Sequence, residues 1–299
     1  MSLRALFDVA APAKLNLFLH VVGRRPDGYH LIESVFTLID WEDTLHFELR
    51  ADGALHRHDL NEPLPADDLC LRAARLLQQQ SGCTLGADIS ITKRIPSGAG
   101  MGGGSSDAAT VLLALNRLWR LHWPRTKLIE LAATIGADVP FFVFGRNALA
   151  RGIGERLQAC DVAPSTFAVL KPEASITTAD LFRSPLLKRD TTSLILSGFP
   201  GDAEAAIPAA DAVRLSDGFG VNDLQTAAEV SCVEVAQALR LMAQLFGNSR
   251  MTGSGSAVFS RVGTVDCPEA TWPCGEIPQA WVRRLCKSLP EHPLRSWTG

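Results

Sequence analysis

The sequence predicts an α+β fold built from two parts. Three observations lead to this prediction. A length of 299 residues suits about two domains. A hydrophobic content of 46% can fill a buried core, and strand-like and helix-like stretches occur in both parts of the chain. We expect the boundary near Cys160, which divides the chain into residues 1–160 and 161–299.

The N-terminal part begins with extended segments. Residues 7–22 and 32–40 have strand-like composition, and the turn-rich sequence GRRPDG at residues 23–28 joins them. A third extended segment covers residues 44–49. We therefore expect three consecutive strands at the start of the fold.

A helix and another strand follow. Asp67 or Asp68 is expected to cap a helix that has four apolar residues on one face. They are Leu69, Ala73, Leu76 and Leu77. Residues 87–93 alternate as a strand does and lead into PSGAGMGGGSSDAA at residues 96–109, which holds five glycines and three serines. Because so much glycine costs conformational entropy on folding, we expect a ligand to approach the main chain closely here.

Helices are expected after this loop. Apolar residues recur at helical spacing over residues 108–119. The expected N-capping residues are Ser105, Ser106 and Asp107. A second helix is expected over residues 125–135, and the turn ADVP that follows it contains Asp138.

The C-terminal part is a second α+β unit. The expected elements are strands at residues 167–171 and 257–260 and helices at residues 233–246 and 279–289. Residues 263–278 are rich in Pro, Gly and Cys, which indicates a surface insertion.

Composition and charge narrow the class of ligand. There are 29 Lys and Arg against 32 Asp and Glu, so a net charge of −3 creates no basic field that would attract nucleic acid or an anionic membrane. Apolar runs such as VPFFVF are far shorter than the roughly twenty residues that span a bilayer. Polar residues interrupt the apolar start of the chain, where a signal peptide needs an unbroken core. We expect a cytoplasmic protein that binds a small molecule.

Cysteine and histidine spacing favours neither a disulfide framework nor a metal site. The seven cysteines are scattered and never form a C-x-x-C pair, so reduced structural thiols are expected. His56 and His58 are the closest histidine pair, and no second cluster of ligands lies near them in the sequence.

Three known phosphate-binding patterns do not account for the glycine-rich loop. Gly98, Gly100 and Gly103 match G-x-G-x-x-G, but the acid that holds a ribose about twenty residues later is missing. A Walker loop needs lysine after its last glycine, whereas Ser105 follows Gly104. The HRD and DFG tripeptides of protein kinases are also absent. The remaining interpretation is a loop that offers backbone N–H groups to phosphate oxygens at a helix N-terminus.

Together with three other segments, this loop resembles the second motif of the GHMP kinases, which are named for galactose, homoserine, mevalonate and phosphomevalonate. The other segments are APAKLNLFLHVVGRRPDGYHLIES near the start, GADVPFF, and MTGSGSAVF at residues 251–259. They match, in order, the branch of the family that phosphorylates a cytidine diphosphate-linked alcohol of the non-mevalonate isoprenoid route. The resemblance implies an N-terminal domain like ribosomal protein S5, with a left-handed βαβ ATP site, and a ferredoxin-like C-terminal domain.

The resemblance also implies an ATP site and two catalytic residues. The residues expected to bind ATP are Pro96, Ser97, Gly98, Ala99, Gly100, Met101, Gly102, Gly103, Gly104, Ser105 and Ser106. Asp138 would be the general base, since phosphoryl transfer to an alcohol needs a group that accepts the hydroxyl proton. Lys14 would keep Asp138 ionised and stabilise the moving phosphoryl group. The use of ATP implies Mg²⁺, for which the sequence identifies no ligand beyond the candidates Ser105 and Ser106.

The substrate end of the site is implied by aromatic residues. Tyr29, the single tyrosine of the chain, and His30 would hold the cytidine base by stacking and hydrogen bonds. Further substrate positions are matched by Asn16, Phe36 and Phe182. Residues 253–255 correspond to a third motif that packs beside the phosphate loop. The sequence leaves both a monomer and a weak dimer open.

Lys93 and two departures from the family pattern need separate mention. Lys93 either approaches the nucleotide or lies exposed at a strand end. Asp107 and Met101 occupy positions where the family frequently has Asn and Leu, and both replacements keep the size of the side chain and should preserve the loop. Asp68 lies where Asn often contacts adenine, and an ionised carboxylate cannot donate a hydrogen bond as an amide does.

Two other functions compete with this prediction. Homoserine and mevalonate kinases are related enzymes, but their substrates have no base for Tyr29 and His30 to stack against. A nucleotide-sensing module could keep the fold without catalysis, but it would have no need of both Lys14 and Asp138. Release of ADP with each candidate substrate distinguishes these alternatives.

Overall fold

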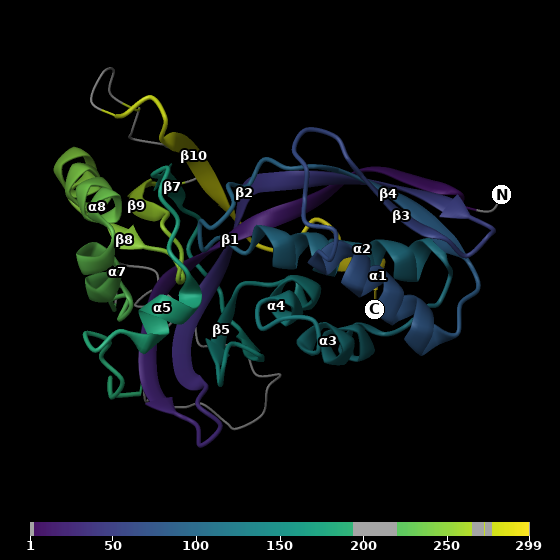
Figure 1. The fold of residues 1–299 in the computed structure, drawn as a ribbon, viewed down its shortest axis with the longest axis horizontal. Coiled ribbons are helices and arrows are strands. Elements are labelled where there is room, and N and C mark those ends of the chain that lie inside the picture. Colours follow the sequence, from purple (N-terminus) through teal and green to yellow (C-terminus); the bar gives the residue numbers. More distant parts are fainter. Residues whose placement is uncertain (1–2, 194–219, 265–271, 273–276, 299) are drawn as a thin grey trace.

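Two long paired strands form the centre of the fold. The structure is a computed structural model that describes residues 3–193, 220–264, 272 and 277–298. Strand β1 (Ala5–Arg24) pairs antiparallel with β2 (His30–Arg50), and both run through the two parts of the molecule (Figure 1). The strands expected at residues 32–40 and 44–49 are thus one strand, because residues 42–44 also pair with β1.

Strand β2 changes partner along the edge that faces away from β1. It pairs first with β5 (Ala148–Arg151), then at two residue positions with β10 (Val282–Leu289), and last with β4 (Gly86–Thr92). Strand β3 (Leu55–Asp59) continues the sheet in parallel beyond β4, and β6 (Arg156–Ala159) continues it beyond β5. A single sheet therefore connects the two parts of the chain.

Four helices cover one face of the N-terminal part (Figure 1). They are α1 (Leu69–Ser81), α2 (Gly103–Leu118), α3 (Arg125–Ala133) and α4 (Val139–Phe144). Helix α2 is the central one and buries most of its residues against the sheet. The helices predicted after Asp68, over residues 108–119 and over residues 125–135, are confirmed. No helix in the described part of the chain is long and apolar enough to cross a membrane.

The first turn of α2 differs from the prediction. Its N-cap is Gly102, in the left-handed region at φ +73°, and no side chain caps the helix. Ser106 instead donates its hydroxyl to the Pro12 carbonyl of β1 at 2.7 Å, and Asp107 pairs with Lys93. The capping prediction is wrong because both side chains are buried and bind groups from other elements.

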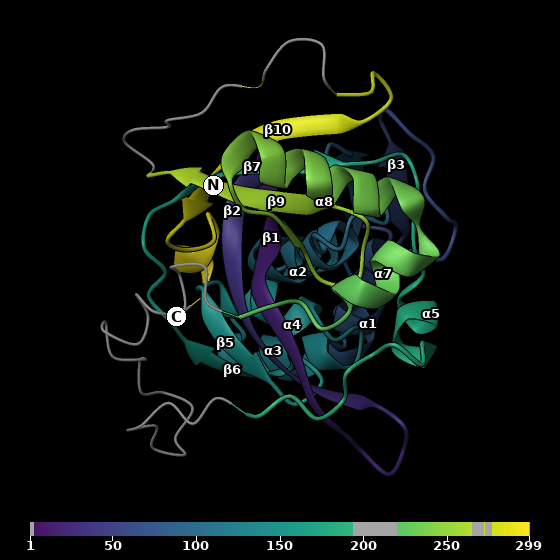
Figure 2. The ribbon, with the colours of Figure 1, turned by 90° about the vertical axis from the view of Figure 1, so that its left-hand side faces the viewer.

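The C-terminal part packs helices on one face of its strands. Strands β7 (Thr166–Lys171), β9 (Val258–Gly263) and the short β8 (Arg250–Met251) pair antiparallel. Helix α7 (Gln225–Ser231) leads into α8 (Val233–Phe246), which lies across β7 and β9 in Figure 2. The predicted strands at residues 167–171 and 257–260 and the helix at residues 233–246 are confirmed.

The helix predicted at residues 279–289 is wrong, because β10 occupies most of this range. Its burial alternates, with Cys286 and Ser288 buried and Lys287 between them exposed, which is the period of a strand. Leu285 pairs with β7, while Ser288 pairs with β2, so β10 joins the two parts of the sheet. The predicted insertion at residues 263–278 falls largely outside the described residues.

The end of the chain returns to the N-terminal helices, where Figure 1 places the C-terminus. The backbone N–H of His292 donates to the carbonyl of Gly145, just after α4, at 3.0 Å. Arg125 of α3 donates to the carbonyl of Thr298 at 3.3 Å, after the 3-10 turn η1 (Arg295–Trp297). The C-terminal segment therefore helps to fix the position of α4, which Asp138 precedes.

Candidate active site

Two cavities lie on either side of the glycine-rich loop. The larger has a volume of about 1100 Å³ and the smaller about 330 Å³. Gly100 and Gly102 line both, so the backbone of the loop forms a wall that the cavities share. This arrangement suits transfer of a group between two ligands.

Glycine is required at several positions of this wall. Gly98, Gly100 and Gly102 have φ values of +66°, +77° and +73°, which other residues rarely adopt. A Cβ on Gly100 would lie 2.3 Å from the carbonyl oxygen of Thr252. Two backbone hydrogen bonds of 3.2 Å, Ser256 N to Gly98 O and Ala257 N to Ala99 O, bring the turn at residues 253–255 against the loop. The resemblance to the third family motif implied this neighbour.

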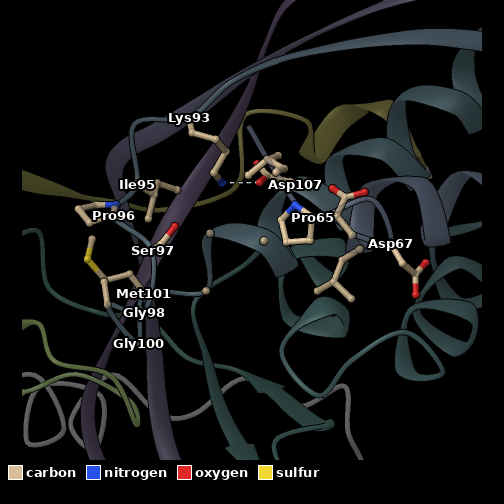
Figure 3. Close-up of a pocket in the computed structure, with 17 residues that line it drawn as sticks. Pro65, Asp67, Lys93, Ile95, Pro96, Ser97, Gly98, Gly100, Met101 and Asp107 are labelled. Carbon is tan, nitrogen blue, oxygen red and sulfur yellow. Dashed lines mark hydrogen bonds and ion pairs between the residues drawn. The ribbon is translucent and has the colours of Figure 1, made fainter. Parts of the chain in front are cut away.

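The smaller cavity is lined by the loop and by the start of α1. Residues 96–104 all line it, together with residues that precede or begin α1 (Figure 3). The N-terminus of α2 begins at the same loop, so its free N–H groups favour an anion there. Ser105 lines the larger cavity instead, and Ser106 is fully buried and lines neither.

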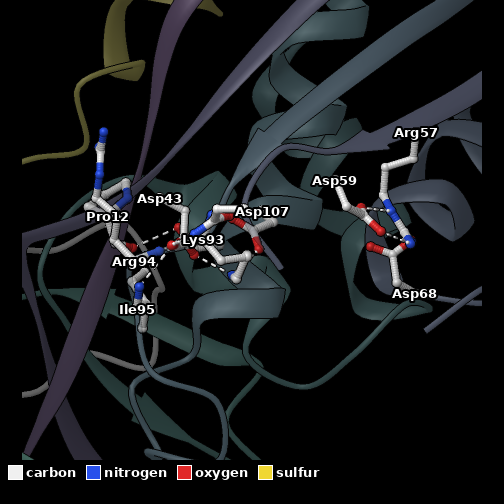
Figure 4. A network of polar contacts seen from close by, with 11 residues as sticks. Pro12, Asp43, Arg57, Asp59, Asp68, Lys93, Arg94, Ile95 and Asp107 are labelled. Carbon is white, nitrogen blue, oxygen red and sulfur yellow. Dashed lines mark hydrogen bonds and ion pairs between the residues drawn. The ribbon is translucent and has the colours of Figure 1, made fainter. Parts of the chain in front are cut away.

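A buried ionic network supports the loop from behind (Figure 4). The ammonium of Lys93 lies between Asp43 and Asp107, 2.5 Å from the Asp107 carboxylate, and all three side chains are buried. The second Asp43 oxygen accepts from the backbone N–H of Ile95 at 2.8 Å and from that of Arg94. Lys93, which directly follows β4, is thereby tied to the residues that lead into the loop.

This network settles one of the open alternatives. Lys93 is not an exposed strand-end lysine, because it is 8% exposed and lines the smaller cavity. Burial disfavours its charge, but the carboxylates of Asp107 and Asp43 outweigh this and raise its pKa. Burial raises the pKa of Asp107 to about 8. Sequence reasoning missed Asp43, which no motif marks.

Asp68 also has a structural partner. Its carboxylate caps α1 by accepting from the N–H of Leu71 at 3.0 Å, and it pairs with Arg57 at 2.7 Å. Arg57 binds Asp59 as well, so two carboxylates face one guanidinium beside the smaller cavity (Figure 4). The carboxylate of Asp68 is therefore already engaged, as the cap of α1 and in an ion pair that Arg57 shares with Asp59.

The larger cavity contains the two charged residues that the sequence singled out. Lys14 projects from β1 and its ammonium lies 3.4 Å from the carboxylate of Asp138, which immediately precedes α4. Lys14 also donates to the side-chain oxygen of Asn16 and lies 4.8 Å from the centre of the Phe36 ring. The Lys14 side chain is 4% exposed and that of Asp138 is 33% exposed, so the carboxylate is the more accessible of the two.

Aromatic residues gather at another end of the larger cavity. The rings of His30 and Phe182, on α5 (Thr178–Arg183), stack with centroids 4.8 Å apart, and Tyr29 beside them is 61% exposed. Burial and the charges of Arg189 and Arg24 lower the pKa of His30. The residues predicted to bind substrate all line this cavity: Asn16, Tyr29, His30, Phe36 and Phe182.

Three arginines of this cavity were missed by sequence reasoning. Arg24, Arg183 and Arg189 line it, and they come from the end of β1, from α5 and from the segment after α5. Nothing in their local sequence marks them as site residues. Their positive charge, with that of Lys14, suits an acceptor that carries phosphate groups.

The described residues contain no cluster of three or more His, Cys, Asp or Glu side chains that could hold a metal ion. Mg²⁺ is commonly bound by one or two protein oxygens together with nucleotide phosphates, so it needs no such cluster. Asp138 and Ser105 place oxygen atoms along the larger cavity. These residues fit a magnesium ion that arrives with a nucleotide.

The chain is similar in sequence to known small-molecule kinases. Residues 68–146 match the family described as GHMP kinases N terminal domain. A protein of Methylibium petroleiphilum named 4-diphosphocytidyl-2-C-methyl-D-erythritol kinase is 58% identical over 300 residues, which cover 100% of both chains. A protein of the same name from Verminephrobacter eiseniae is 51% identical, with 99% of each chain covered.

Solved structures have the same fold. A crystal structure of 4-(cytidine 5'-diphospho)-2C-methyl-D-erythritol kinase matches with a TM-score of 0.69 and 35% identity, over 87% of this chain and 91% of that one. Homoserine kinase from Cytophaga hutchinsonii matches with a TM-score of 0.65 over 96% and 95% of the two chains, and at 15% identity this likeness concerns the fold. The predicted two-domain GHMP kinase fold is confirmed. The chain belongs to the GHMP kinases, and within them to the family of 4-diphosphocytidyl-2-C-methyl-D-erythritol kinases.

Proposed function

We propose that the protein transfers the γ-phosphoryl group of ATP to the 2-hydroxyl of 4-diphosphocytidyl-2-C-methyl-D-erythritol, forming the 2-phosphate and ADP in the non-mevalonate isoprenoid route. The observation that carries this proposal is the position of the glycine-rich loop between two cavities, one of which holds the Lys14–Asp138 pair and the aromatic cluster. The names of the full-length relatives supply the substrate.

Asp138 acts as the general base in this proposal. Its carboxylate accepts the proton of the acceptor hydroxyl while the oxygen attacks the γ-phosphorus. The ammonium of Lys14, 3.4 Å away, stabilises the ionised carboxylate and the negative charge of the phosphoryl group. Since Lys14 is also held by Asn16, it stays aimed at the reacting groups.

ATP is assigned to the smaller cavity, with its phosphates along residues 96–104. The backbone N–H groups of the loop and of the first turn of α2 donate to the phosphate oxygens. Mg²⁺ would be held by those phosphates with Ser105 or Asp138, and it would neutralise charge between the β- and γ-phosphates. Ser106 keeps the start of α2 against β1 through its bond to Pro12.

The cytidine group is assigned to the aromatic cluster. Tyr29, His30 and Phe182 offer flat faces for a base, and stacking of this kind contributes about 1–3 kcal/mol per base in nucleic-acid complexes. Asn16 and Phe36 lie near Lys14 and would contact the erythritol end. The acceptor would therefore extend from the cluster to the Lys14–Asp138 pair.

The organisation of the chain is part of the same proposal. We assign residues 1–160 to the ATP-binding part and residues 161–299 to the part that completes the acceptor cavity, as Phe182 and Arg189 do. The enzyme would act in the cytoplasm, where its donor ATP is made, on a small molecule rather than nucleic acid or membrane. It would be a monomer or a weak dimer.

The test measures ADP release with ATP, Mg²⁺ and each of three acceptors: the cytidyl substrate, homoserine and mevalonate. Turnover with the cytidyl substrate alone is expected. Asp138→Asn and Lys14→Ala should each lower kcat by orders of magnitude while ATP binding stays near that of the unaltered protein. ATP binding without ADP release from any acceptor would favour a nucleotide sensor, and near-normal turnover of Asp138→Asn would remove Asp138 from the base role.

A further inference from the structure

Arg189 makes four hydrogen bonds around the aromatic cluster, and none of them is to Lys14 or Asp138. Its guanidinium donates to Nε2 of His30 at 3.2 Å and to the carbonyl of Leu187 at 3.2 Å. It also donates to the carbonyls of Phe182 at 3.1 Å and Ser184 at 3.0 Å. The Arg189 side chain thus ties the end of α5 to His30, the first residue of β2, which lies 159 positions before Arg189 in the chain.

The bond to His30 determines where that ring carries its proton. A guanidinium has donors and no acceptor, so Nε2 of His30 must accept and cannot carry hydrogen. A neutral imidazole then has its proton on Nδ1. Among the described residues, Nδ1 of His30 has no hydrogen-bond partner, and the residue lines the larger cavity.

The geometry points to Arg189 as the residue that positions the aromatic cluster: it holds the His30 ring against Phe182 with Nε2 as acceptor, so that Nδ1–H faces a bound base as a donor. This inference rests on the proposed function, because it takes a pyrimidine base as the ligand. The carbonyl and ring nitrogen of cytosine are acceptors, which such a donor complements. Arg189 is a positioning residue here and takes no part in the transfer itself.

Charge acts in the same direction as geometry. The charged groups that act on the His30 ring are Arg189, from the segment after α5, and Arg24, from the end of β1. Burial, Arg189 and Arg24 all disfavour a second proton on the ring. Removing Arg189 should therefore let His30 gain a proton at higher pH, and a protonated ring would no longer have Nε2 as an acceptor.

The experiment compares Arg189→Met, Arg189→Lys and a control, Arg240→Met, which removes an exposed arginine of α8. NMR titration of the imidazole C–H signals, with His30→Gln to identify the signal, measures the His30 pKa without any turnover. Steady-state kinetics give KM for the cytidyl substrate, KM for ATP and kcat. Calorimetry with CDP alone measures binding of the base and its phosphates.

For Arg189→Met we expect the His30 pKa to rise, and KM for the cytidyl substrate and Kd for CDP to increase about tenfold. KM for ATP should stay within about twofold, because the smaller cavity is untouched. Arg189→Lys keeps the charge but cannot make all four bonds, so the pKa should stay nearer the original while KM remains raised. Arg240→Met should change none of these values.

An unchanged His30 pKa and KM in Arg189→Met would overturn the inference, and so would an equal rise in both KM values. Failure of CDP to bind the unaltered protein would overturn the assignment of a base to Nδ1–H. Absence of turnover with the cytidyl substrate would instead refute the proposed function. In that case the NMR titration still decides whether Arg189 holds the His30 proton on Nδ1.

Discussion

Replacing Lys93 with methionine tests the ionic network that supports the glycine-rich loop. Methionine has similar length and no charge, so the change leaves the carboxylates of Asp43 and Asp107 adjacent to each other, at 0% and 1% exposure, without the ammonium between them. Removing one partner of a buried ion pair typically costs about 3–5 kcal/mol. Here the charge of the buried Asp43 carboxylate would keep only the backbone N–H groups of Arg94 and Ile95, with no ammonium beside it. We expect a loss of this size in the free energy of unfolding.

Equilibrium unfolding in urea, followed by tryptophan fluorescence, measures this loss, and Asp107→Asn is the matched comparison. This change keeps the shape of the side chain and leaves one ammonium with one carboxylate, so it should cost about 1 kcal/mol or less. In the double variant, Lys93→Met with Asp107→Asn, the only carboxylate of the network that remains is that of Asp43. The loss in the free energy of unfolding should therefore be smaller than for Lys93→Met alone.

The pH dependence provides a second readout of the same network. Burial raises the pKa of Asp107 to about 8 in the folded state, above the usual value near 4 of an unfolded chain. The folded state therefore binds more protons between these pH values, and this group's contribution to stability decreases as pH rises through that window. Asp107→Asn should remove that decrease.

The result that would refute this reasoning is a loss below about 1 kcal/mol for Lys93→Met with an unchanged urea dependence. It would mean that water or another cation reaches the two carboxylates. A stability of Asp107→Asn that declines with pH as steeply as that of the unaltered protein would contradict the raised pKa of Asp107.

Three further predictions concern the loop, the C-terminal segment and the metal. Gly100→Ala should raise KM for ATP at least tenfold in ADP-release kinetics. A left-handed φ costs alanine roughly 1–2 kcal/mol, and the added Cβ would lie 2.3 Å from the carbonyl oxygen of Thr252. An unchanged KM would show that the loop relaxes around the added methyl group. Burial lowers the pKa of His292 from 6.5 to about 3, so the unfolded chain binds a proton between these pH values and the folded chain does not. The free energy of unfolding therefore falls as pH drops from about 6.5 towards 3. His292→Gln should reduce this fall in urea titrations at several pH values. EDTA should stop ADP release and added Mg²⁺ should restore it, whereas full activity in EDTA would exclude the ion from the reaction.

The local sequence pattern was sufficient to predict elements whose apolar face and capping residue lie close together in the chain. Helix α8 lies at residues 233–246 as its apolar spacing predicts, and Asp68 caps α1 as expected. Strand β10 was mistaken for a helix because its exposed arginines and lysine obscure the alternation of Cys286 and Ser288. Its partners β7 and β2 lie more than one hundred residues earlier in the chain, so the sequence around β10 does not indicate that it pairs with them.

The candidate site was predictable as far as family motifs extend. Lys14, Asp138 and the aromatic residues belong to such motifs, and the structure brings them to one cavity. Asp43 and Arg189 belong to none, and each acts by contacts with segments far away in sequence. Lys93 remained ambiguous for the same reason, since its two carboxylate partners lie 50 and 14 residues away.

Strand β2 has a mechanical consequence for the whole molecule. Because it pairs with β5, β10 and β4 in succession, both parts of the chain are fastened to the same stretch of backbone rather than to a flexible linker. The two parts cannot swing apart as separate lobes without breaking the hydrogen bonds of a central strand. Ligand entry is then left to local rearrangement of the surface turns around each cavity, such as that between β1 and β2.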